Sequence, residues 1–141
     1  MTDSLNHIVL IEDNETTSFL NNRLLSRLGV ARQVSSYSKA DEAARAIWGD
    51  APAATSALVA PTAPELVFVD LKMPGMTGFE FLEHYSRLPP DAQQRTVVAV
   101  LTTSMHAADT ARVARYPNVE YLTKPLTEEK ILRLLNKRFN S

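Results

Sequence analysis

The feature that most constrains the fold of this chain is a regular alternation between short apolar runs and longer segments with helical spacing. Five short runs are rich in β-branched residues and bounded by polar or turn residues, which is typical of strands. These predicted strands cover residues 7–11, 31–37, 65–69, 96–101 and 119–123. The first, third and fourth are almost continuously apolar, as central strands of a parallel sheet are, whereas the second and fifth are mixed and should lie at the edges.

Five further segments show the spacing of amphipathic helices. They cover residues 19–28, 39–48, 79–88, 107–116 and 128–139. We expect Gly29 to end the first helix in a left-handed conformation, Ser38 to cap the second, and Thr127 to open the fifth. The residues expected to share one side of a helix are Phe19, Leu20, Arg23, Leu24 and Leu28 in the first, Ala40, Ala43, Ala44 and Ile47 in the second, Phe79, Leu82 and Tyr85 in the third, and Ile131, Leu134, Leu135 and Arg138 in the fifth.

This order of elements predicts a single α/β domain over residues 1–141, with a parallel sheet and helices on both of its faces. A chain of 141 residues has the usual size of one domain. We expect residues 1–6 to form a short N-terminal extension. Residues 49–64 hold three prolines among many Ala, Ser and Thr residues, and this composition predicts a long surface connection.

The amino-acid composition argues against several functional classes. With 15 basic and 16 acidic residues the net charge is −1, which leaves little electric field to attract nucleic acid. The absence of cysteine excludes disulfides, thiolate metal sites and cysteine nucleophiles. The longest apolar run near the N-terminus covers only residues 8–11, too short for a signal peptide or a membrane span. We therefore expect a cytoplasmic protein that binds neither nucleic acid nor membranes directly.

Polar residues stand where the predicted strands end, and the carboxyl ends of parallel strands form the usual ligand-binding edge of such a sheet. The residues are Glu12 and Asp13 after the first strand, Asp70 after the third, Thr102 after the fourth and Lys124 after the fifth. Each has an ordinary explanation when taken alone, as a helix cap, a strand residue or a solvated charge. Together, however, the three carboxylates would repel one another unless a cation neutralised them.

Magnesium suits this set of side chains because it prefers oxygen ligands. We expect Asp13 and Asp70 to bind Mg²⁺ directly and Glu12 to bind it through water, with a backbone carbonyl from the loop after Asp70 as a further ligand. The ammonium of Lys124 and the hydroxyl of Thr102 would then hold phosphoryl oxygens. Such an arrangement favours phosphoryl transfer to a carboxylate, with Asp70 as the nucleophile.

These residues resemble the receiver domain of bacterial two-component response regulators. The resemblance covers essentially the whole chain and rests on the acidic pair 12–13, the run DLKMPGMTG from Asp70, Thr102, Tyr121 and the Lys-Pro pair 124–125. It implies a doubly wound, flavodoxin-like (βα)5 fold whose five parallel strands have the order 2-1-3-4-5. It further implies a stand-alone phosphoacceptor response regulator: a phosphorelay signalling protein rather than an enzyme, which assists its own phosphorylation and dephosphorylation.

The resemblance also implies a role for each site residue. Asp70 would accept a phosphoryl group from a sensor histidine kinase or a histidine phosphotransfer protein. Lys124 would pair with that group, Thr102 would move to hydrogen-bond it, and Tyr121 would swing inward. The implied Mg²⁺ ligands are Glu12, Asp13, Asp70 and the backbone carbonyl of Lys72. The switch would alter the face formed by the fourth helix, fifth strand and fifth helix, where a downstream protein effector or a second copy in a homodimer would bind.

Other functions predict different residues. A nucleotide- or flavin-binding protein of this architecture should carry glycines after the first strand, where this chain has EDNETT. A phosphatase of the haloacid dehalogenase type should have a second aspartate where Lys72 stands. A receiver-like interaction module that never turns over phosphate stays open as the alternative. Within the resemblance, the Lys124-Pro125 bond should be cis, and Thr103 replaces the usual alanine and could narrow access to the phosphorylation site.

Overall fold

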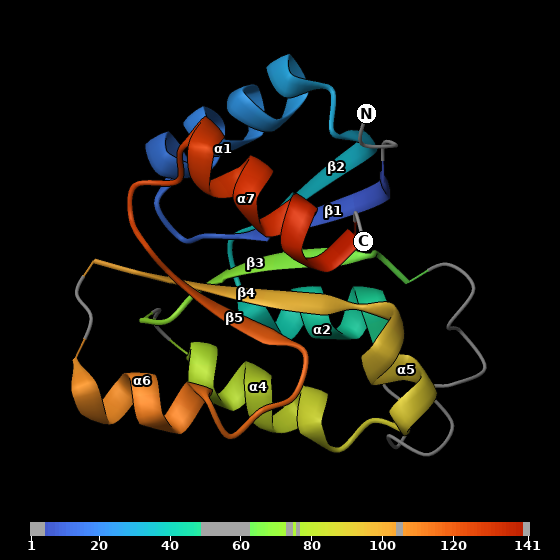
Figure 1. Ribbon diagram of the computed structural model, residues 1–141, viewed down its shortest axis with the longest axis vertical. Helices are drawn as coiled ribbons and strands as arrows, with labels where there is room; N and C mark the ends of the chain where they lie inside the picture. Colours follow the sequence, from blue (N-terminus) through green and yellow to red (C-terminus); the bar gives the residue numbers. More distant parts are fainter. Residues whose placement is uncertain (1–4, 49–62, 73–74, 76, 104–105, 140–141) are drawn as a thin grey trace.

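The computed structural model describes residues 5–48, 63–72, 75, 77–103 and 106–139. Their strands form one parallel sheet with the order β2-β1-β3-β4-β5, which confirms the predicted order and places β2 and β5 at the edges (Figure 1). The strands are β1 (Leu5–Ile11), β2 (Ala31–Tyr37), β3 (Leu66–Asp70), β4 (Val97–Thr102) and β5 (Val119–Thr123). The helices are α1 (Glu15–Leu28), α2 (Ala40–Trp48), α4 (Gly78–Ser86), α5 (Pro90–Arg95), α6 (Ala107–Val113) and α7 (Glu128–Phe139).

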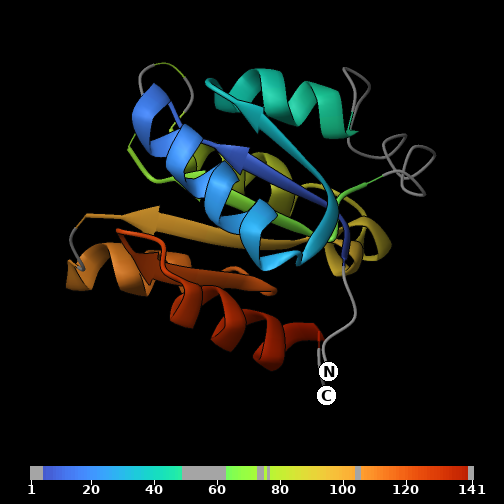
Figure 2. The ribbon, with the colours of Figure 1, turned by 90° about the horizontal axis from the view of Figure 1, so that it is seen from above.

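Helices cover both faces of the sheet, as predicted for a doubly wound fold. Helices α1 and α7 lie on one face, and α2, α4 and α6 lie on the other (Figures 1 and 2). Each face has its own apolar cluster. The three central strands are almost wholly buried between these clusters, whereas β2 and β5 are only partly buried. The near-continuous apolar sequences of the three central strands therefore reflect burial from both sides of the sheet.

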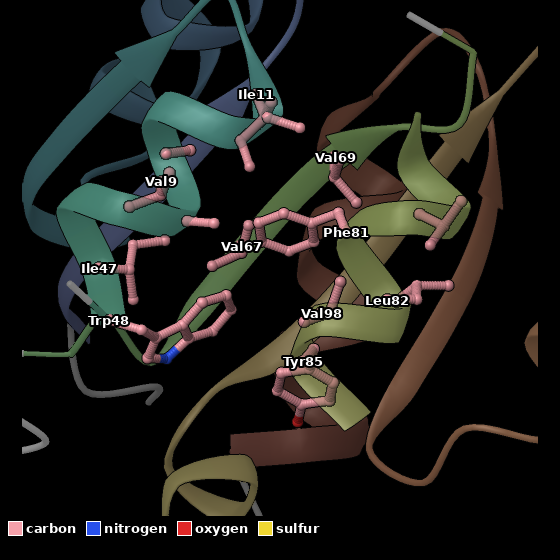
Figure 3. Close-up of a cluster of buried hydrophobic side chains, with 14 of the residues drawn as sticks. Val9, Ile11, Ile47, Trp48, Val67, Val69, Phe81, Leu82, Tyr85 and Val98 are labelled. Carbon is pink, nitrogen blue, oxygen red and sulfur yellow. The ribbon is translucent and has the colours of Figure 1, made fainter. Parts of the chain in front are cut away.

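The cluster beneath α2 and α4 is built around aromatic rings (Figure 3). Trp48 packs against Phe81 and Tyr85, with ring centroids 5.4 and 5.9 Å apart, and these rings lie over Val67 of the central strand. The residues predicted for one side of α2 are all buried and belong to this cluster. On the opposite face, the apolar residues contributed by α1 and α7 include Leu25, Ile131, Leu134 and Leu135.

Several helix boundaries follow directly from the sequence. Gly29 ends α1 in the left-handed conformation with φ 64°, as predicted, and its N–H donates to the carbonyls of Leu25 and Ser26. Thr127 accepts a hydrogen bond from the backbone N–H of Lys130 at 3.2 Å, as expected for a residue that opens a helix. Helix α4 begins with a capping box made by Thr77 and Glu80.

The apolar residues expected to share one side of α1 are not all buried. Phe19 is 63% exposed and Leu20 is 54% exposed, whereas Leu25 and the polar Asn21 are buried. Apolar residues occupy positions 19, 20, 24, 25 and 28, and this stripe is wider than the part of a helix that one sheet can cover. The helix therefore buries Leu25, and two large apolar side chains remain on the surface.

Smaller differences concern element boundaries. Strand β1 begins at Leu5, two residues before the predicted start, while β3 and β4 each begin and end one residue later than predicted. In α4 the fully buried phenylalanine is Phe81, and Phe79 is only partly buried. Helix α5 was not predicted, because its sequence PDAQQR is short and lacks apolar spacing.

The predicted connection over residues 49–64 falls mostly outside the described residues. Its last residue, Pro64, is buried, and its carbonyl accepts a hydrogen bond from the Thr96 hydroxyl at 2.7 Å. Among the described residues, none of the helices is long and apolar enough to cross a membrane.

Candidate functional site

The predicted site residues meet at the carboxyl edge of the sheet. Asp70 is the last residue of β3 and Thr102 the last of β4, while Lys124 follows β5 directly. Glu12 and Asp13 follow β1, which pairs with β3. Since β3 also pairs with β4, and β4 with β5, the four strand ends bring residues from distant parts of the sequence side by side.

Three carboxylates form the centre of this edge. One oxygen from each of Glu12, Asp13 and Asp70 lies within 4.8 Å of the others. Glu12 and Asp70 are buried, and Asp13 is exposed. The ammonium of Lys124 donates hydrogen bonds to Glu12 Oε1 at 2.7 Å and to Asp70 Oδ2 at 3.1 Å. One ammonium leaves two of the three negative charges unbalanced when all three carboxyl groups are ionised.

Backbone N–H groups hold the other oxygens of the two buried carboxylates. Glu12 Oε2 accepts from the N–H of Asn14 at 3.2 Å, and Asp70 Oδ1 accepts from the N–H of Lys72 at 3.2 Å. In both cases the N–H donor lies two residues after the carboxylate, so each side chain bends toward the backbone of the loop that follows it. Each buried carboxylate is thereby oriented by one backbone donor and by the same lysine.

Burial and hydrogen bonding set the charge states of this pair. Burial raises the pKa of Glu12, and the hydrogen bond from Lys124 opposes this effect without cancelling it. For Lys124, burial alone would lower the pKa, but the hydrogen bonds to Glu12 and Asp70 outweigh it and the pKa is raised. Lys124 is therefore a permanent positive charge near neutral pH.

The donor set fits a hard divalent cation. All the charged ligand atoms are carboxylate oxygens, which Mg²⁺ and Ca²⁺ prefer over nitrogen or sulfur. The excess negative charge beside Lys124 would be balanced by one divalent ion. The exposed Asp13 leaves the cluster accessible from solvent.

Two glycines shape the loop after Asp70. A Cβ on Gly78 would lie 2.7 Å from Leu71 Cα and 2.8 Å from the Asp70 carbonyl oxygen, so only glycine fits there. Gly75 has a φ of 77°, a left-handed conformation that glycine adopts without strain. Gly75 and Gly78 therefore occupy positions where a larger residue would strain the backbone or collide with it.

The two predicted switch residues lie on the same side of the sheet. Tyr121 is opposite Val100 in the β4–β5 register, and Thr102 follows Val100 by two positions. Because side chains alternate along a strand, Thr102 and Tyr121 both face the side covered by α2, α4 and α6. Thr102 is buried and Tyr121 partly buried. The Thr102 carbonyl also accepts a hydrogen bond from the Lys124 N–H at 2.6 Å.

Grooves lie on both sides of α1 next to the site. One, of about 500 Å³, runs between α1 and the segment after β5, and Leu20, Leu24, Thr103 and Lys124 are among its lining residues. The other, of about 380 Å³, lies between the acidic pair and the end of β2, with Phe19 along its wall. The exposed side chains of Phe19 and Leu20 form a ridge between the two grooves, which we call the α1 ridge.

The segment that carries Lys124 holds one confirmed prediction and one feature that sequence reasoning missed. The Lys124–Pro125 bond is cis, as predicted. Lys130 in the first turn of α7 donates hydrogen bonds back to Thr123 and Pro125, on either side of Lys124. The sequence places Lys130 only within the predicted helix over residues 128–139, because contacts of this kind depend on the path of the intervening loop.

One family model matches almost the whole chain. Residues 8–136 match the model of the response regulator receiver domain. The protein PilH of Pseudomonas aeruginosa is 33% identical over 81 residues, which are 57% of this chain and 64% of PilH. The chain thus spans less than two thirds of the length of this relative.

Solved structures show the same fold. A two-component response regulator from Cytophaga hutchinsonii superposes with a TM-score of 0.83 at 22% identity, covering 98% of this chain and 99% of that one. The receiver domain of the sensor histidine kinase PA1611 from Pseudomonas aeruginosa PAO1, which has a magnesium ion coordinated in its active site cleft, gives a TM-score of 0.73 at 18% identity, with coverages of 96% and 98%. Because the family match extends over residues 8–136, the chain belongs to the response regulator receiver domain family, whose members are two-component signalling proteins rather than classical enzymes.

Proposed function

We propose that this receiver domain accepts a phosphoryl group on Asp70 from the phosphohistidine of a sensor histidine kinase or a phosphotransfer protein, in a Mg²⁺-dependent reaction. The observation that carries the proposal is the setting of the Asp70 carboxylate. It is buried at the end of the central strand, within 4.8 Å of two further carboxylates, and it accepts a hydrogen bond from Lys124. A carboxylate with an adjacent cation and a metal-binding cluster is suited to attack phosphorus.

In the transfer, a carboxylate oxygen of Asp70 attacks the phosphorus atom. The new O–P bond forms as the N–P bond to the imidazole breaks, and the electron pair of that bond stays on the freed nitrogen. The donor histidine leaves as a neutral imidazole when its other ring nitrogen already carries a proton. Lys124 keeps its own proton, because its pKa is raised, and donates an N–H hydrogen bond to a phosphoryl oxygen. It needs to shift only slightly, since its ammonium already contacts Asp70.

Glu12, Asp13 and Asp70 would hold Mg²⁺, together with the backbone carbonyl of Lys72. When bound, the ion would neutralise charge on the carboxylates and on the phosphoryl oxygens. Two observations support this choice: the oxygen-only cluster in this chain, and the magnesium ion in the cleft of the PA1611 receiver domain, which has the same fold.

Phosphorylation would then switch a binding surface through Thr102 and Tyr121. The Thr102 hydroxyl would hydrogen-bond the phosphoryl group, and Tyr121 would move into the space that Thr102 leaves. Their position on the same side of adjacent strands supports such coupling. The surface affected would comprise α6, β5 and α7, which correspond to the fourth helix, fifth strand and fifth helix of the sequence prediction, and it would bind a protein effector or a second copy of the chain.

The phosphohistidine donor would dock on the α1 ridge. Phe19 and Leu20 are large apolar side chains that the fold leaves exposed, and the groove beside Leu20 leads to Lys124. An exposed apolar ridge beside a reactive site is typical of a protein-binding surface. A donor protein covering this ridge could bring its histidine to the carboxylate cluster.

The test is an NMR titration with Mg²⁺ followed by beryllofluoride, which mimics a phosphoryl group on a carboxylate. We expect the backbone amide signals of Asp13, Lys72, Thr102 and Lys124 to shift in the wild type, and Asp70→Asn to abolish the beryllofluoride response. As a matched control, Asp91→Asn removes an exposed carboxylate of α5 and should respond like the wild type. A wild type that does not respond would refute the phosphoacceptor role and favour an interaction module that works without phosphate.

A further inference from the structure

A second lysine ties the segment that carries Lys124 to helix α7. The Nζ atom of Lys130 lies 2.7 Å from the carbonyl oxygen of Thr123, 3.2 Å from Thr123 Oγ1 and 2.9 Å from the carbonyl oxygen of Pro125. An ammonium has three N–H donors, so these three contacts can use all of them. The two carbonyls belong to the residues directly before and after Lys124, and we call this set of contacts the Lys130 clamp.

Lys130 is attached to a well-packed part of α7. Lys130 lies in the first turn of the helix, and its backbone N–H donates to the Thr127 hydroxyl at 3.2 Å. The next residue, Ile131, is fully buried in the apolar cluster beneath α1 and α7. The ammonium is therefore attached to a packed helix rather than to a mobile loop.

The clamp also has a specific effect on the backbone at Lys124. Two carbonyl oxygens converge within 3 Å of one positive charge, and hydrogen bonds to a charged donor are shorter and stronger than neutral ones. Without that charge the two partial negative charges would no longer be drawn together. The hydrogen bond from the Lys124 N–H to the Thr102 carbonyl and the pairing of β5 with β4 would remain, and both act on the side of Lys124 that precedes Pro125.

We propose that Lys130 is a positioning residue for phosphoryl transfer, which fixes the backbone around Lys124 so that the Lys124 ammonium reaches the carboxylates and the phosphoryl group. The inference rests on the proposed function, because it concerns the cation that would bind the phosphoryl oxygens. Lys130 acts through Lys124 and touches neither Glu12 nor Asp70 among the hydrogen bonds of the described residues.

Three variants test the proposal. Lys130→Met removes the donors and keeps the length of the side chain, whereas Lys130→Arg keeps the charge and several donors. Lys137→Met is the matched control, since Lys137 lies on the same helix and pairs with Glu120 at 3.1 Å, away from the Lys124 segment. The first measurement is the rate of phosphorylation by acetyl phosphate with Mg²⁺. The second is the chemical shift of the Lys124 side chain in ¹³C-lysine protein without phosphodonor, recorded at one neutral pH.

We expect Lys130→Met to be phosphorylated about tenfold more slowly, because a small misplacement of a charge-stabilising group has a large effect on rate. In the same variant the Lys124 signal should move toward that of an exposed lysine, since its ammonium would lose part of its contact with Glu12 and Asp70. Lys130→Arg should restore most of the rate and the signal. Lys137→Met should match the wild type in both measurements.

A Lys130→Met protein with a wild-type rate, or with a wild-type Lys124 signal, would overturn the proposal. Should this variant fail to fold, Lys130→Gln, which keeps one donor group, is measured in the same way and must show both effects. Failure of the proposed function looks different: the wild type itself would not be phosphorylated, and the Lys124 side-chain signal without phosphodonor would still show whether Lys130 positions Lys124.

Discussion

Replacing Gly78 by alanine should destabilise the protein and slow phosphorylation, because the new methyl group would collide with backbone atoms at the site. The added Cβ would lie 2.7 Å from Leu71 Cα and 2.8 Å from the Asp70 carbonyl oxygen. Ordinary contacts between carbon atoms are about 3.5–4.0 Å, so the two segments must separate by roughly 1 Å. The atoms that must move belong to the residue that would carry the phosphoryl group and to its neighbour.

The magnitude follows from what resists this movement. Leu71 is held by hydrogen bonds from its N–H to the Leu101 carbonyl and from the Gly78 N–H to its own carbonyl, both 2.9 Å long. Overpacking typically costs about 1–3 kcal/mol, and weakening a hydrogen bond adds about 1 kcal/mol. Alanine regains up to about 1 kcal/mol of helix propensity at the start of α4. We therefore expect a net loss of roughly 2 kcal/mol in the free energy of unfolding.

This loss in the free energy of unfolding can be measured by urea denaturation, monitored through the fluorescence of Trp48, the single tryptophan of the chain. Gly75 provides a matched comparison in the same loop: a Cβ there meets nothing within 4 Å, but its φ is 77°. Gly75→Ala should therefore lose about 1–2 kcal/mol through backbone strain, and Gly75→Asn should lose less, because asparagine tolerates this conformation. Gly78→Asn should not be better tolerated than Gly78→Ala. A Gly78→Ala protein that keeps wild-type stability and a wild-type phosphorylation rate would refute the steric argument.

Three further predictions concern the core, the α1 ridge and pH. Phe81 is fully buried, so Phe81→Ala should lower the free energy of unfolding by about 3–5 kcal/mol in urea denaturation, and a loss below about 1 kcal/mol would contradict the packing described. Leu20→Glu should slow transfer from a phosphohistidine protein but not from acetyl phosphate, whereas equal slowing of both would argue against docking on the α1 ridge. Burial, and to a smaller extent the charge of Arg87, lowers the pKa of His84 below 6.5. As the pH falls, the unfolded chain therefore binds a proton at this histidine before the native protein does. Stability from this source is present above about pH 6.5 and is lost as the pH falls through the native pKa. His84→Phe should therefore reduce the acid-induced drop in urea midpoint between about pH 7.5 and about pH 5.5, and an unchanged drop would contradict this prediction.

The sheet and the centre of the site could be predicted because both follow from strong local signals combined with topology. Three nearly continuous apolar runs required strands buried on both faces, and parallel strands bring their carboxyl ends to one edge. Glu12, Asp70 and Lys124 therefore had to meet, although they are far apart in the sequence.

The remaining features depend on tertiary geometry that periodicity does not determine. The apolar stripe of α1 is too wide to show which residues turn inward, so the exposure of Phe19 and Leu20 could not be predicted. Helix α5 has no apolar pattern, and its position is set partly by the buried Tyr85 hydroxyl, which lies 2.6 Å from the carbonyl oxygen of Gln93. The Lys130 clamp depends on how six residues after Lys124 turn into α7, and a lysine at the start of a helix gives no sign of it.

Identifying the phosphorylated residue tests the role of Asp70 as phosphoacceptor. The protein is incubated with acetyl phosphate and Mg²⁺, the acyl phosphate is reduced with borohydride, and the modified residue is located by mass spectrometry of peptides. We predict one modified residue, Asp70, with no modification after Mg²⁺ is chelated and none in Asp70→Asn. A wild type that stays unmodified, or that is modified at another residue to the same extent in Asp70→Asn, would contradict the central claim.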